Sequence, residues 1–174
     1  LNESDMHAMG LRLSSEDIYS INKSSLKDAV VHFGGGCTAE VVSDQGLILT
    51  NHHCGYGQIQ MHSTEENNYL KNGFWAMTNS QELKNKNLTA TFIVRIEDVT
   101  QRILEGITPD MSAEQIAKLK ASNKNNIISG ATKDTHFEAQ IKPFFYGNEY
   151  YMIITETYKD VRLVGAPPSS IGKF

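Results

Sequence analysis

The sequence has no excess of positive charge and no long apolar run. Its 16 lysines and arginines are outnumbered by 20 aspartates and glutamates, which gives a formal net charge of −4. Nucleic acids and anionic membrane surfaces are bound through basic patches, so we expect neither as a partner. No apolar stretch approaches the roughly 20 residues that a membrane-spanning helix needs, and we therefore expect no membrane insertion.

Cysteine is scarce, and repeats and low-complexity tracts are absent. Only Cys37 and Cys54 occur in the 174 residues, as a disulfide or as two separate buried thiols. Hydrophobic residues make up 40% and charged residues 21%, which is ordinary for a globular domain with its own core. The sequence begins with Leu1 rather than Met and ends abruptly at Phe174, so we expect it to belong to a longer protein.

Short apolar or β-branched segments predict a mainly β fold. Glycine-rich or polar turns, such as residues 34–36 and 43–46, separate them at a spacing typical of antiparallel meanders. The pattern indicates a barrel-type β domain with inserted helices rather than a βαβ sheet. The expected strands are residues 29–33, 38–42, 47–50, 89–96, 137–145, 149–158 and 161–164.

Capping boxes at Ser14 and Ser112 predict two helix starts. Each serine is followed three residues later by a side chain that can reach back to the serine's backbone N–H. We expect the first helix to end near Asn22 and the second to fade in the polar stretch 122–126. A further helical stretch is expected near residues 65–71.

Residues 47–54, Leu-Ile-Leu-Thr-Asn-His-His-Cys, carry the side chains most suited to chemistry. An expected strand is followed by His53 and then directly by Cys54. Cys37 lies on the strand expected to pair with this one through the 43–46 turn, and paired strands lie about 5 Å apart. A disulfide tolerates that separation, and it would fix the loop that bears His53 against the neighbouring strand.

This arrangement resembles the first barrel of chymotrypsin-type peptidases, where Thr-Ala-Ala-His-Cys ends a strand and the cysteine bonds to one on the preceding strand. By that match His53, rather than His52, aligns with the catalytic base, and Cys37 and Cys54 form a structural disulfide. Longer motifs resemble the bacterial dipeptidyl-peptidase 7 and 11 family. They are residues 34–38, 46–57, 72–76, 94–99 and 158–174.

The resemblance implies a serine-type peptidase that releases dipeptides from the free N-terminus of oligopeptides. It implies a chymotrypsin-like antiparallel double barrel with an inserted helical domain and no cofactor. Residues 1–27 would be a helical lead-in, and residues 28–174 the first part of the peptidase domain. Family members are dimeric enzymes of the periplasm or cell surface of Gram-negative bacteria, so we expect a secreted homodimer for the parent protein.

The resemblance also implies that most of the catalytic apparatus lies elsewhere. The family places its nucleophilic serine in a Gly-Asn-Ser-Gly type of loop, and no Gly-x-Ser-Gly sequence occurs here. The triad aspartate is expected beyond Phe174. We therefore expect these 174 residues to be inactive by themselves. A trypsin-like binding module without catalytic activity is the alternative.

Two further patterns suggest other chemistry. A small metal-binding domain could use His52, His53, His62 and the cysteines, but adjacent His53 and Cys54 chelate one ion poorly and paired zinc spacing is absent. We predict no metal site. Asp98 follows His53 at an interval similar to that in chymotrypsin, and we interpret it as a helix-start or surface carboxylate.

The remaining motifs have structural interpretations. The glycines at 34–36 lack the lysine and following helix of a phosphate-binding loop, so we expect a turn or bulge. His32 and His136 are expected on the surface. Cross-strand packing accounts for the aromatic group Phe144, Phe145, Tyr146, Tyr150, Tyr151 and Tyr158.

Overall fold

The computed structural model describes residues 2–172 and divides them into two compact units. The first unit joins residues 2–24 with Ile93–Glu156, and the second joins Ser25–Phe92 with residues 157–172. Strands β6 (Ala90–Asp98) and β8 (Glu149–Tyr158) each contribute to both units. The domain boundary expected at residue 27 stays a prediction. Across residues 2–172, no helix combines the length and apolar character needed to span a membrane.

The second unit contains the predicted meander. Strands β1 (Val30–Phe33), β2 (Cys37–Val41) and β3 (Ile48–Leu49) pair antiparallel in sequence order, and β1 also pairs with β6. The glycine run forms the turn between β1 and β2, with Gly34 and Gly35 at positive φ. Alternate residues of β1 are buried, as expected for a strand with one face on a core. The core of this unit consists of Val31, Phe33, Ala39, Leu88 and Ala90.

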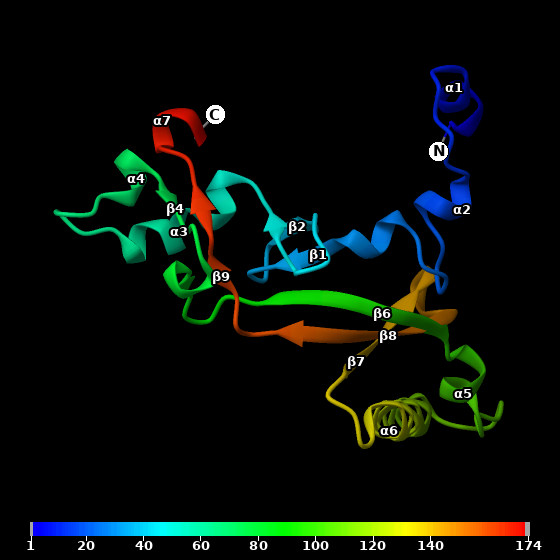
Figure 1. Ribbon diagram of the computed structural model, residues 1–174. Coiled ribbons are helices and arrows are strands. Elements are labelled where there is room, and N and C mark those ends of the chain that lie inside the picture. Colours follow the sequence, from blue (N-terminus) through cyan, green and yellow to red (C-terminus); the bar gives the residue numbers. More distant parts are fainter. Residues whose placement is uncertain (1, 173–174) are drawn as a thin grey trace. The chain divides into compact units, whose positions relative to one another are not determined.

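Short elements complete the second unit (Figure 1). The largest is α3 (His52–His62), which the sequence did not predict because Gly55 and Gly57 disfavour a helix. The helix expected near residues 65–71 is shorter than predicted, since α4 covers Tyr69–Asn72 and residues 65–68 are not helical. The other elements are η1 (Leu26–Ala29), β4 (Phe74–Trp75), η2 (Asn79–Gln81), β5 (Leu83–Lys84), β9 (Arg162–Leu163), β10 (Gly165–Ala166) and α7 (Ser169–Gly172).

The first unit packs helices against the β7–β8 hairpin. The hairpin joins β7 (Glu138–Phe144) to β8 through η3 (Phe145–Gly147). Its core cluster is aliphatic and contains Val99, Ile103, Ile127, Ile141, Met152 and Ile154. The helices that contribute to this cluster are α5 (Thr100–Leu104) and α6 (Ala113–Thr132). The unit also contains α1 (Glu3–Ala8) and α2 (Ser15–Ile18), which bury no residue.

Two helix ends in the first unit differ from expectation because of tertiary contacts. Helix α6 continues through the polar stretch 122–126, where the Asn123 amide donates to the carbonyl oxygens of Ile103 (3.1 Å) and Glu105 (3.0 Å). Helix α2 ends before Asn22, whose side chain instead exchanges two hydrogen bonds with the backbone of Ile96. Side-chain amides satisfied in this way hold the backbone more strongly than local propensity does.

The fold is mainly β with helices, as predicted. Six strands form an antiparallel sheet in the order β3-β2-β1-β6-β8-β7. Within residues 2–172 this order is open, because β3 and β7 lie at its two ends and do not pair with each other. Closure into a chymotrypsin-like barrel stays a prediction.

Candidate active site

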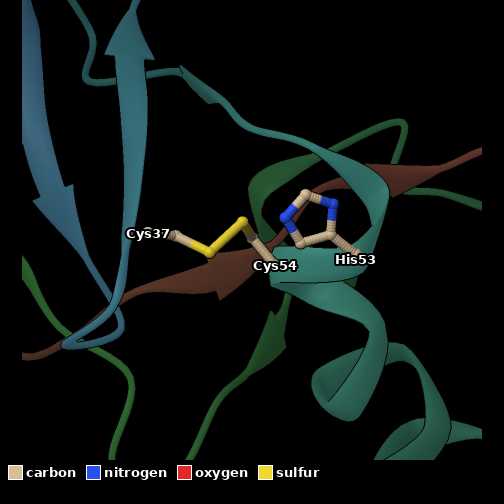
Figure 2. Close-up of side chains that lie close together, drawn as sticks. All are labelled: Cys37, His53 and Cys54. Carbon is tan, nitrogen blue, oxygen red and sulfur yellow. A yellow bond between two sulfur atoms is a disulfide. The ribbon is translucent and has the colours of Figure 1, made fainter.

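The candidate base His53 lies in the first turn of α3 in the second unit. Asn51 is the N-cap of this helix, but its side chain makes no capping hydrogen bond. His53 is exposed, and Figure 2 shows its imidazole beside the disulfide. An uncapped helix end frays easily, so the geometry of His53 depends on what else holds this turn.

A disulfide holds the residue directly after His53. Cys54 is bonded to Cys37 of β2, with the two Cα atoms 6.1 Å apart. Both cysteines are partly buried against the hydrophobic cluster of the second unit. The helix start is thereby joined covalently to the strand β2.

The same two cysteines argue against a metal site. One ligand atom each from Cys37, His53 and Cys54 lie within 4.8 Å of one another. Metal binding by cysteine requires a thiolate, and here both sulfur atoms are consumed by the disulfide. His62 lies at the other end of α3 and does not join this cluster. Its Nε2 atom lies 3.0 Å from the Asn85 side-chain oxygen.

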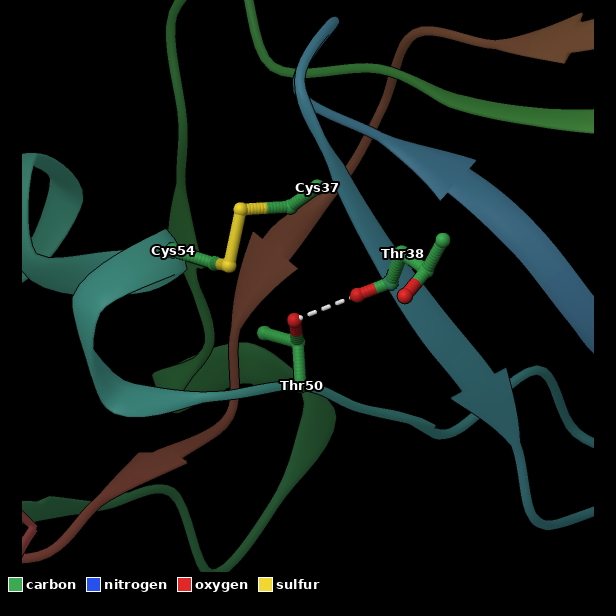
Figure 3. Close-up of a disulfide and its surroundings, with 4 residues drawn as sticks. All are labelled: Cys37, Thr38, Thr50 and Cys54. Atoms are coloured by element: carbon green, nitrogen blue, oxygen red, sulfur yellow. Dashed lines mark hydrogen bonds between the residues drawn. A yellow bond between two sulfur atoms is a disulfide. The ribbon is translucent and has the colours of Figure 1, made fainter.

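A hydrogen bond fixes the residue just before the helix. The Thr50 hydroxyl donates to the Thr38 carbonyl oxygen over 2.8 Å, next to the disulfide, as Figure 3 shows. Thr38 follows Cys37 on β2. Two neighbouring residues of one strand therefore hold Thr50 and Cys54, on either side of His53.

The neighbouring histidine is already engaged. The His52 Nε2 atom lies 3.2 Å from the Ser169 hydroxyl oxygen of α7, and the His52 Nδ1 atom is buried. Of the two adjacent histidines, His53 is exposed and His52 is partly buried, so His53 is the more accessible to a reactant. The sequence could not have indicated Ser169, which lies 117 residues away along the chain.

Within residues 2–172, no carboxylate forms a hydrogen bond with His53. Asp98, which follows His53 at a chymotrypsin-like interval, lies in the first unit. Its carboxylate accepts a hydrogen bond from the Thr100 backbone N–H at the start of α5. Hydrogen bonds from Thr100 lower the Asp98 pKa from its usual value. Asp98 therefore acts as a helix-start carboxylate, and within residues 2–172 no acidic side chain orients the candidate base His53.

The sequence that carries this site matches a known protein family. The model of the family described as Peptidase S46 matches residues 1–174. The chain belongs to the peptidase S46 family. The disulfide-held turn bearing His53 is therefore a feature of an S46 peptidase sequence.

Individual relatives of this S46 chain are dipeptidyl-peptidases. An "Asp/Glu-specific dipeptidyl-peptidase" of Capnocytophaga gingivalis is 56% identical over 174 residues, and a "Dipeptidyl-peptidase 7" of the same organism is 47% identical. Each match covers the whole chain but 24% of the relative, so the chain spans about a quarter of their length. A crystal structure of Porphyromonas endodontalis DPP11 with substrate matches 98% of the chain and 26% of its own, with a TM-score of 0.78 at 45% identity.

Proposed function

We propose that His53 is the general base of a serine-type dipeptidyl-peptidase whose full length extends beyond these 174 residues. The observation that carries this proposal is an exposed imidazole on a helix turn fixed on both sides by a disulfide and by side-chain hydrogen bonds. Membership of the S46 family, with relatives named as dipeptidyl-peptidases, supports it.

The proposed chemistry is acyl transfer through a serine. His53 accepts the proton of a serine hydroxyl as that oxygen attacks the peptide carbonyl, and it then donates the proton to the leaving amine. Water repeats the cycle, with His53 as base, and releases the dipeptide. The serine and an orienting aspartate would come from the rest of the protein, where closure of a chymotrypsin-like double barrel would bring them to His53.

Substitution of His53 in the full-length protein tests this proposal. We expect His53→Ala to lower kcat on a fluorogenic dipeptide substrate by at least about 10³-fold, since triad members act as a unit. His32→Ala, which changes another exposed histidine of the same unit, should leave kcat unchanged. Comparable activity in the two variants would contradict a catalytic role for His53.

We infer a preference for acidic residues at the second substrate position. The support is the identity within one organism, which is 56% to the Asp/Glu-specific relative and 47% to dipeptidyl-peptidase 7. The measurement is kcat/KM for dipeptide substrates ending in Asp or Glu against those ending in an aliphatic residue. A higher value for the aliphatic substrates would overturn the preference and leave the reaction class intact.

The disulfide supports an oxidising compartment for the parent protein. Structural disulfides persist mainly in the periplasm, at cell surfaces and outside cells, so we propose a periplasmic or cell-surface location. Cell fractionation followed by thiol labelling of Cys37 and Cys54 tests it. We also propose a homodimer of the parent protein, which sedimentation of the full-length protein tests.

A further inference from the structure

The side chain of His52 occupies an unusual position for a residue adjacent to a candidate catalytic base. Its Nε2 atom contacts the Ser169 hydroxyl oxygen at 3.2 Å, and its ring meets Tyr56 edge to face with centroids 6.0 Å apart. The buried Nδ1 atom has no hydrogen-bond partner within residues 2–172. The imidazole is therefore enclosed between α3 and α7.

Gly172 makes this enclosure possible. A Cβ atom at that position would lie 2.6 Å from the His52 Nδ1 atom, closer than real Cβ contacts, and 3.0 Å from Cγ, which is also tight. The φ angle of Gly172 lies outside the left-handed region, so space rather than backbone conformation requires glycine. A side chain at Gly172 would push the imidazole, and with it the first turn of α3, away from α7.

A displacement of His52 would also move His53, because His53 lies between two residues that are bonded to other elements. Cys54 is bonded to β2, and His52 is hydrogen-bonded to α7. The disulfide and the Thr50 hydrogen bond both tie the turn to β2, whereas the His52 contact ties it to a different element, α7, and so restricts its movement relative to β2. A misplacement of about 1 Å can lower a catalytic rate about 10²-fold.

We propose that His52 is a positioning residue for His53, acting through Ser169 in the space left by Gly172. This inference rests on the proposed function, because it assigns His52 a role relative to the general base. His52 and Ser169 touch neither the nucleophile nor the substrate in this scheme. They hold the turn of α3 so that the His53 imidazole stays in place for proton transfer.

The test uses His52→Ala, Ser169→Ala and their combination in the full-length protein. We expect each single variant to lower kcat by about 10- to 100-fold with KM within about twofold. The double variant should lose no more than either single variant, because both remove the same contact. Ser169→Thr, which keeps the hydroxyl, should recover most of kcat. Losses that multiply in the double variant would overturn the proposal.

Two further variants separate positioning from stability. Gly172→Ala favours the helical backbone by its propensity, yet we expect it to lower kcat because its Cβ displaces His52. Ile154→Ala removes a buried side chain from the other unit. It should lower the thermal midpoint and leave kcat unchanged at a temperature where the protein is folded. A kcat loss in Ile154→Ala equal to that in His52→Ala would contradict positioning.

Hydrogen exchange gives a readout independent of activity. We expect His52→Ala and Ser169→Ala to accelerate exchange in residues 50–56 and 167–172 relative to the unsubstituted protein. Unchanged exchange in both segments would overturn the contact itself. Full activity in His53→Ala would overturn the proposed function, whereas an inactive His53→Ala together with full kcat in His52→Ala would overturn only the positioning role.

Discussion

Both units of the molecule have an apolar core, but the disulfide and the candidate site belong to the second. The first has an aliphatic cluster in which Met152 is 1% and Ile154 0% exposed, and it contains no part of the candidate site. The second has a smaller cluster, and its site turn is held by a disulfide and by hydrogen bonds from Thr50 and His52. Apolar packing is non-directional and determines a fold, whereas directed bonds can fix the position of one helix turn.

The largest loss of stability is expected from the core of the first unit. Ile154→Ala should lower the free energy of unfolding by about 2–5 kcal/mol, because it leaves a cavity in a packed cluster. Ile93→Ala, at a strand residue that is 39% exposed, is the control and should cost much less. Denaturant unfolding of the full-length protein measures both. Equal losses would contradict a tightly packed core at Ile154.

Removal of the disulfide should cause the next largest loss of stability, and it should also lower kcat. Replacing both Cys37 and Cys54 with alanine removes a cross-link between residues 17 apart, which is worth about 3 kcal/mol in the chain-entropy model. We also expect kcat to fall, because the turn of His53 loses its covalent tether. Reductant should lower the activity of the unsubstituted protein but not that of the double variant. A double variant with full kcat would contradict the role of the disulfide.

A smaller effect is expected from the threonine tether. Thr50→Val removes the hydroxyl that donates to the Thr38 carbonyl oxygen and should cost about 1 kcal/mol, with a modest fall in kcat. Thr38→Val is a matched control, since the backbone oxygen of Thr38 accepts the bond and its side chain is not needed. The thermal midpoint and kcat are measured for both. An equal fall in kcat for the two variants would count against the tether.

The smallest effect is expected at the exposed carboxylate of the first unit. Hydrogen bonds from Thr100 lower the Asp98 pKa below 3.8, so the contribution of Asp98 to stability is present above that value. It is lost as the pH falls through the lowered pKa. The thermal midpoints of the unsubstituted protein and Asp98→Asn should therefore differ slightly near pH 6 and converge in acid. A difference that grows in acid would reverse the assigned sign.

Much of the second unit could be predicted from local patterns. The turns at 34–36 and 43–46 connect strands that are neighbours along the chain, so they act through local backbone preferences. Within β1 the polar His32 lies between the apolar Val31 and Phe33, and this alternation is visible in the sequence as well. The expected hairpin of β7 and β8 was likewise found. These elements depend on neighbours along the chain, and the sequence shows those neighbours directly.

Helices were predicted less well, because distant contacts override propensity. Helix α3 forms despite Gly55 and Gly57, since Cys54 is anchored to β2 and Ile59 is buried. Helix α6 passes through a polar stretch because Asn123 reaches α5. Neither partner lies near in sequence, so no local pattern could report it.

The sequence by itself determined the longer strands and the turns between them, and its resemblance to a peptidase family pointed to His53 rather than His52 as the candidate base. Only the tertiary structure decided the environments of the two histidines. It placed Ser169 and Gly172 against His52 and left the His53 imidazole exposed beside the disulfide. The exposure and the hydrogen bonds of a residue depend on which distant segments fold back onto it. The chemical identity of two adjacent histidines therefore does not show which of them is exposed.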